Sequence, residues 1–330
     1  MARIGVAFSG GLQPTEIVEC VRLADELGYE SAWVAEGHGG DQFAILAACA
    51  GVTRRIKLGT SISSVFVRSP TTIGMAAATV DQLSGGRFVL GLGSSHRVQV
   101  EPEHGVPFLQ PTQRLRETVD VVRALARDGV VAHAGKVVTI ERFELWFTPL
   151  RRTLPIYISA LFPPMLQIGG EIADGVLLTW PTTESGRRAA DNVAIGARRA
   201  GRSPADVDVA SLIPCYVARD QRAAFDGMRN AVAFYAGFFP RYNRLLAESG
   251  FARAVASIKE AFDSGDRAEA ARRVPDELLA AITAAGTPEQ CRAKVETYRG
   301  SGIALPIISP RASGPGGKQM AVDALRACAP

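Results

Sequence analysis

The feature that most constrains the fold is a regular alternation of short, β-branched apolar segments with longer amphipathic ones. This alternation is typical of βα units, in which helices connect the successive strands of a parallel sheet. The candidate strands are residues 3–9, 31–35, 56–62, 88–93, 156–160, 175–180, 207–218 and 304–309. Eight such strands predict an α/β fold of the (β/α)8 TIM-barrel type, with residues 1–330 forming a single domain.

Helices are predicted in the gaps between these strands, at residues 14–27, 41–50, 71–83 and 112–126. The first has Pro14 in its opening turn and Gly28 directly after its last apolar position. These residue types commonly start and end a helix, because proline presets the helical φ angle and glycine adopts the left-handed conformation of the cap.

Two segments interrupt the repeat. Residues 130–147 alternate apolar and polar side chains on either side of His133 and Lys136, which predicts a β-hairpin. Residues 236–275 carry aromatic side chains among charged ones, which predicts a helical lid. We expect both insertions at the C-terminal face of the strands, because the loops of a TIM barrel carry its function there.

Composition excludes several classes of partner. The net charge is only +4, and the arginine pairs are dispersed along the chain, so nucleic acid is not expected as a partner. Five cysteines without a Cys-x-x-Cys pair indicate reduced thiols and a cytoplasmic protein. No apolar run approaches the roughly 20 residues that a membrane helix needs, so no membrane association is expected.

Ionisable residues follow the second and fourth predicted strands. Glu36 and His38 come after residues 31–35, and His96 comes after residues 88–93, so all three are candidate proton donors or acceptors. A structural alternative is that Glu36 caps the next helix and that His38 is a solvated loop residue. Glu101, Glu103 and His104 follow His96 without the spacing of a known metal motif, so no metal is expected.

Small residues at the ends of three strands are candidates for holding a flat ring and a phosphate. Ser61, Ile62 and Ser63 end the third strand and offer hydroxyl groups beside an apolar face. Gly93, Ser94 and Ser95 end the fourth, where glycine permits a close approach of the backbone. The turn after residues 156–160 enters a helix, and a helix N-terminus attracts anions.

Several short blocks together are more specific than any one of them. They are Trp33-Val-Ala-Glu36, Leu58-Gly-Thr60, Arg68-Ser-Pro70, Ser84-Gly-Gly-Arg87-Phe-Val-Leu-Gly-Leu-Gly93, Arg114-Leu-Arg-Glu117, Pro155-Ile-Tyr-Ile-Ser-Ala160 and Gly170-Glu-Ile-Ala-Asp-Gly175. In this order they resemble the luciferase-like monooxygenase superfamily. Within it, the chain is most similar to the coenzyme F420-dependent branch typified by methylenetetrahydromethanopterin reductase.

The resemblance implies hydride transfer between coenzyme F420, a deazaflavin, and a small organic substrate at a C=N, C=C or C–OH centre. It also implies a non-prolyl cis peptide at Ser61–Ile62 that supports the ring. The expected cofactor-binding residues are Ser61, Ile62, Ser63, Gly93, Ser94, Ser95, Gln99, Ser159, Ala160, Leu161, Phe162 and Met165.

The catalytic residues depart from the pattern of relatives that oxidise sugar phosphates. Those relatives have Asp-His where this chain has Glu36-Gly37, and a glutamate where it has His96. The resemblance therefore favours a different substrate. Among His96, His38 and Glu36 we expect His96 to be the proton donor, because an imidazole titrates near neutral pH.

Two other functions remain open at this point. One is an FMN-dependent two-component monooxygenase of the luciferase-like type, and the other is a flavin-binding relative without catalysis. A homodimer is expected, and a flavin or F420 reductase is the candidate partner that supplies reduced cofactor. The substrate is not identified by these residues.

Overall fold

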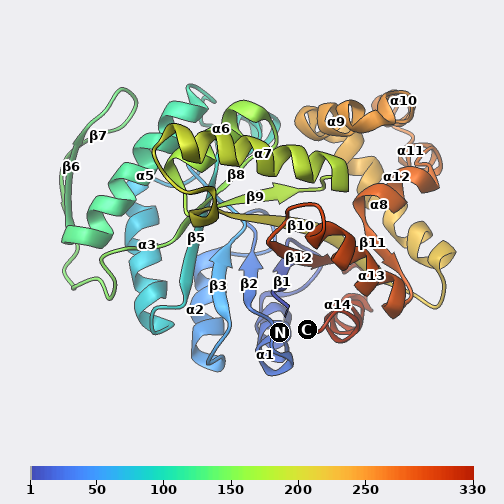
Figure 1. Ribbon diagram of the computed structural model, residues 1–330, viewed down its shortest axis with the longest axis horizontal. Helices are drawn as coiled ribbons and strands as arrows, with labels where there is room; N and C mark the ends of the chain where they lie inside the picture. The colour runs from blue at the N-terminus through green and yellow to red at the C-terminus, as the bar shows by residue number, and fades with distance from the viewer. Residues whose placement is uncertain (1) are drawn as a thin grey trace.

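The computed structural model describes residues 2–330 and contains a closed barrel of eight parallel strands (Figure 1). Neighbouring strands pair around the circle, and β9 pairs with β10 to close it. In spatial order the strands are β1 Gly5–Phe8, β2 Ser31–Val34, β3 Lys57–Thr60, β5 Phe88–Gly93, β8 Ile156–Ser159, β9 Gly175–Thr179, β10 Asp208–Val217 and β12 Leu305–Pro310. The predicted (β/α)8 barrel and its eight strands are confirmed.

Two short strands extend the sheet without entering the circle. β4 Ser63–Ser64 pairs with the end of β5, directly after the chain leaves β3. β11 Ala284–Gly286 pairs with the end of β10. Both lie beside the C-terminal ends of barrel strands, so they lengthen the wall on the side where the loops gather.

Helices surround the barrel, and none within residues 2–330 has the length and apolar character to cross a bilayer. The predicted helices are present as α1, α2, α3 and α5. The set comprises α1 Pro14–Leu27, α2 Gln42–Val52, α3 Pro70–Leu83, α4 Arg97–His104, α5 Pro111–Asp128, α6 Pro163–Ile172, α7 Thr183–Arg199, α8 Gln221–Phe238, α12 Asp276–Ile282, α13 Pro288–Arg299 and α14 Gly317–Ala327. Local signals explain the first: Pro14 begins α1, and Gly28 ends it at a φ of 90°.

The N-terminal end of the barrel is filled by side chains. The Trp33 ring lies against Gly59, where an added Cβ would be only 2.4 Å from the ring. Trp33 also packs against Tyr157, with ring centroids 5.4 Å apart, and the Tyr157 hydroxyl donates to Asp208 at 2.6 Å. Arg3 bonds the same carboxylate at 2.7 Å. These contacts close the N-terminal end of the barrel, so that its C-terminal end is left to hold a ligand.

The hairpin of residues 130–147 is present, as β6 Val130–Ala134 and β7 Thr139–Glu144. Its expected position at the C-terminal face of the strands is wrong. α5 runs antiparallel to the barrel strands, so the chain leaves it at their N-terminal side. The hairpin then packs outside α3 and α5 (Figure 1), in an apolar cluster with Val121 and Leu125.

Three helices occupy the segment expected as a lid: α9 Pro240–Leu246, α10 Ala252–Asp263 and α11 Arg267–Arg272. α10 and α11 pack against α8 on the outside of the molecule (Figure 1). Only the residues around the α8–α9 junction turn inward. The part of this segment that reaches the barrel mouth is therefore shorter than residues 236–275.

Candidate functional site

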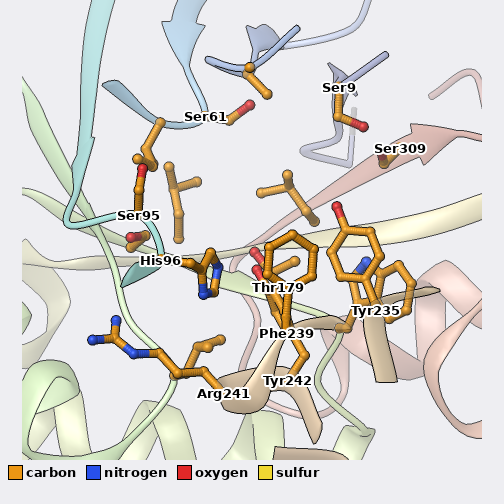
Figure 2. A pocket seen from close by; sticks show the side chains of 18 of the residues that line it. Ser9, Ser61, Ser95, His96, Thr179, Tyr235, Phe239, Arg241, Tyr242 and Ser309 are labelled. Carbon is orange, nitrogen blue, oxygen red and sulfur yellow. The ribbon is translucent and has the colours of Figure 1, made fainter. Parts of the chain in front are cut away.

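A cavity of about 790 Å³ opens at the C-terminal end of the barrel. Each of the eight barrel strands contributes a residue from its C-terminal part or from the position just beyond it, which is where the active sites of such barrels lie. These residues are Ser9, Ala35, Ser61, Ser94, Ser159, Thr179, Pro214 and Ser309. The α8–α9 junction lies across it and adds Tyr235, Phe239, Arg241 and Tyr242 (Figure 2).

Ile62 projects into this cavity from a bulge after β3. The Ser61–Ile62 peptide bond is cis, as the resemblance implied. The Ser61 amide donates to the Val34 carbonyl at 2.8 Å, while its buried hydroxyl has no hydrogen-bond partner within residues 2–330. An apolar side chain beside an unpartnered hydroxyl suits a flat ring with polar edges.

Gly93 lies directly behind Ile62. A Cβ at this position would come within 2.7 Å of Ile62 Cδ1 and 2.4 Å of Ser159 Oγ. Glycine is therefore needed for Ile62 to occupy its place. Gly93 and Ser63 do not line the cavity; Ser63 is buried in β4 and supports the bulge from behind. The other expected cofactor-binding residues all line it: Ser61, Ile62, Ser94, Ser95, Gln99, Ser159, Ala160, Leu161, Phe162 and Met165.

Glu36 lines the cavity, but both of its carboxylate oxygens are occupied. Oε1 accepts from Arg68 Nε at 2.6 Å, and Oε2 accepts from the Ser64 amide at 2.7 Å. Arg68 also bonds Asp41, which caps α2. The arrangement makes Glu36 a positioning residue that fixes the chain after the Ile62 bulge.

His38 lies at the rim of the cavity, and its side chain is 78% exposed. Its Nε2 is 3.2 Å from a carboxylate oxygen of Glu103. An exposed imidazole paired with a carboxylate is poorly placed to act on a group held deep in the cavity. The structure therefore brings Glu36, His38 and His96 to one cavity, at very different depths.

His96 is the N-cap residue of α4, and one side of its ring packs against aromatic side chains (Figure 2). The ring centroids of Phe239 and Tyr242 lie 4.6 Å and 5.3 Å from it. Burial, assisted by the positive charge of Arg241, lowers the pKa of His96 to about 4. The expectation that this imidazole titrates near neutral pH is wrong, because distant parts of the chain bury the ring. The sequence alone did not show which residues these are.

Arg241 stands beside His96 and faces Ser94. Its Nη1 lies 3.3 Å from Ser94 Oγ, and its guanidinium lies over the Phe108 ring. Burial lowers the pKa of Arg241, and no carboxylate within the described part of the chain forms an ion pair with it. A cation next to two serines and without a carboxylate partner is suited to an anionic ligand group.

The turn into α6 contributes less to anion binding than its position suggested. Pro163 and Pro164 have no amide hydrogen, the Ala160 amide donates to Leu177, and the Met165 amide donates back to Phe162. Of the amides in residues 159–165 that were expected to donate to an anion, those of Ala160 and Met165 are therefore engaged within the protein. The amides of Leu161 and Phe162 are left, and Arg241 supplies the charge.

Several cavity residues were not predicted. Trp180 has a φ of 59° and stacks on Tyr235, with ring centroids 4.1 Å apart. Trp180 ends a predicted strand, which was an available signal. Arg241 and Arg311 were not singled out, since they enter the cavity from segments whose paths the local pattern does not determine.

The chain belongs to the luciferase-like monooxygenase family, whose model matches residues 1–305. Its relatives include two 5,10-methylenetetrahydromethanopterin reductases. The enzyme of Archaeoglobus fulgidus is 29% identical to this chain, and the alignment covers 91% of both proteins. The enzyme of Methanolobus tindarius is 27% identical, again over 91% of both proteins. The structure of the coenzyme F420-dependent tetrahydromethanopterin reductase from Methanopyrus kandleri is similar, with a TM-score of 0.88 and 26% identity over 99% of this chain and 98% of that one.

Proposed function

We propose that this protein is a coenzyme F420-dependent oxidoreductase that transfers a hydride between the coenzyme and a small organic substrate at a C=N, C=C or C–OH centre. The observation that carries the proposal is the bulge at Ile62, which lines the cavity and for which Gly93, behind it, leaves room. The similarity to methylenetetrahydromethanopterin reductases supports the choice of coenzyme.

The residues present fit a ring joined to a phosphate-bearing side chain. Ile62 offers an apolar face to the ring, and the unpartnered hydroxyl of Ser61 is available to its polar edge. Ser94, Ser95 and Arg241 form a polar, positively charged end for the phosphate. Gln99, Ser159 and the turn to Met165 line the path between these ends.

When bound, coenzyme F420 supplies a two-electron hydride carrier. The protein must exclude water and manage a proton at the reacting heteroatom. Phe239 and Tyr242 pack against the His96 ring and reduce its contact with water. Because its lowered pKa leaves His96 neutral at pH 7, we assign it as the group that exchanges a proton with the reacting heteroatom, accepting the proton when the substrate is oxidised and returning it when the substrate is reduced.

Other parts of the proposal concern the setting of the reaction. We infer that residues 1–330 work as one barrel domain with the α8–α9 junction as its lid, and that two copies form a homodimer in the cytoplasm. A separate F420 reductase would regenerate the reduced coenzyme. These inferences rest on the family resemblance and not on a contact in this structure.

The proposal is tested by ligand-dependent thermal unfolding with coenzyme F420, FMN, FAD and NADPH. A ligand that binds the folded state at about 100 times its Kd adds roughly 2.7 kcal/mol of stability. We expect the largest shift with F420 and a much smaller one in Arg241→Gln.

A larger shift with FMN, together with oxygen consumption by reduced FMN in the presence of the protein, would support the two-component monooxygenase instead. Binding of any cofactor without turnover of any substrate class would support the non-catalytic alternative.

A further inference from the structure

A second arginine faces the cavity from the end opposite Arg241. Arg311 directly follows β12, and its backbone amide donates to the Cys215 carbonyl at 2.8 Å, which ties this residue to the barrel. Its side chain lines the cavity. Its Nε is buried and has no hydrogen-bond partner within residues 2–330, and no carboxylate of that range pairs with its guanidinium.

Two other partly buried arginines of the barrel have a counter-charge, whereas Arg311, like Arg241 and Arg114, has no carboxylate partner within residues 2–330. Arg68 bonds two carboxylates, and Arg151 forms a bidentate pair with Asp81. Burying a guanidinium N–H without a partner costs free energy that such pairs offset. A cavity that keeps Arg311 unpaired is therefore arranged for an anionic group brought by a ligand.

The surroundings of Arg311 define what that ligand looks like. Ser9 and Ser309 end the neighbouring strands β1 and β12, and Figure 2 shows them across the cavity from Ser95 and Arg241. Tyr235 also lines the cavity and stacks on Trp180, with ring centroids 4.1 Å apart. This end of the cavity thus combines one cation, two hydroxyl groups and an aromatic wall.

The position of Arg311 is held by close backbone packing. Gly11, with a φ of 80°, lies against Ala312, so that a Cβ at Gly11 would be 2.0 Å from the Ala312 carbonyl oxygen. The loops after β1 and β12 are therefore locked together beside the arginine. A fixed backbone at this position limits the range over which the arginine side chain can move.

Building on the proposed function, we propose that the organic substrate is a carboxylate with a flat apolar body. Arg311 binds its carboxylate, with Ser9 and Ser309 beside it, and the wall of Tyr235 and Trp180 contacts its body. The opposite end, at Ser94 and Arg241, is left for the coenzyme phosphate. One cavity thus binds two anions at two separate arginines.

The test is calorimetric titration of the protein loaded with oxidised coenzyme F420, using benzoate and its neutral analogue benzamide as probes. A charge-assisted pair predicts that benzoate binds roughly tenfold to a hundredfold more tightly. Arg311→Gln should abolish this preference, and Arg311→Lys should retain part of it. Arg326→Gln, which removes an exposed arginine on α14, serves as the matched control and should behave like the wild type.

Coenzyme affinity provides the second readout. We expect Arg311→Gln to bind F420 within about twofold of the wild type, which also shows that it is folded. Equal binding of the two probes, binding of neither at about 10 mM, or an unchanged preference in Arg311→Gln overturns the proposal. A large loss of F420 affinity in this variant does so too, because it assigns Arg311 to the coenzyme.

Failure of the wild-type protein to bind F420 is a separate result. It contradicts the proposed function and not the anion site. The same two probes titrated into the coenzyme-free protein then decide whether Arg311 selects a carboxylate.

Discussion

The state of His96 has a measurable effect on the pH dependence of stability. Burial lowers the pKa of His96 from 6.5 to about 4 in the folded protein, whereas the unfolded chain takes up this proton below about pH 6.5. Between these values the unfolded state binds more protons, so stability falls as the pH falls through this window. The full difference corresponds to about 3 kcal/mol, of which about 2 kcal/mol is lost between pH 7.5 and pH 5.

The experiment compares urea unfolding of the wild type and of His96→Asn at pH 7.5 and pH 5. Asparagine does not titrate, so the contributions of all other groups cancel when the two proteins are compared. We expect the wild type to lose about 2 kcal/mol more than the variant over this interval. A difference below about 0.5 kcal/mol would refute the view that His96 is held neutral by burial.

Two further predictions concern residues that position the site, and a third concerns the anchor of the hairpin. Gly93→Ala should weaken F420 binding roughly 5-fold to 100-fold, because the added Cβ displaces its neighbours into the cavity, while Gly37→Ala, which meets open space, should bind normally; equal affinities would contradict this. Glu36→Gln should lower the free energy of unfolding by about 1–3 kcal/mol in urea titrations, and a neutral effect would remove its positioning role. Glu117→Gln should speed hydrogen exchange of the Lys136 and Val138 amides, because each donates a hydrogen bond of 2.7 Å to the Glu117 carboxylate. Unchanged exchange would show that this carboxylate does not anchor the hairpin.

The barrel was predictable because its signals are local. Each strand is a short apolar run, and residues such as Pro14 and Gly28 mark the ends of a helix. The strand ends also converge by the topology of the fold alone, which is why the positions of Ile62, Ser94 and Ser159 along the chain were enough to predict that they meet at one cavity.

The parts that could not be predicted depend on contacts between distant segments. The pKa of His96 is set by Phe239 and Tyr242, which reach it only through the path of α8 and α9. The hairpin lies outside α5 because of that helix's direction, which the alternation of its residues does not reveal. Arg241 and Arg311 have no distinguishing neighbours in the sequence, and only the folded cavity shows that they lack carboxylate partners.

The central claim is that the cavity binds the deazaflavin with its ring against Ile62 and its phosphate beside Arg241. A crystal structure of the protein with oxidised coenzyme F420 tests this most directly. The account predicts the ring in van der Waals contact with Ile62, and a phosphate oxygen within hydrogen-bond distance of Ser94 or the Arg241 guanidinium. A ring bound away from Ile62, or a phosphate paired with Arg311, would contradict it.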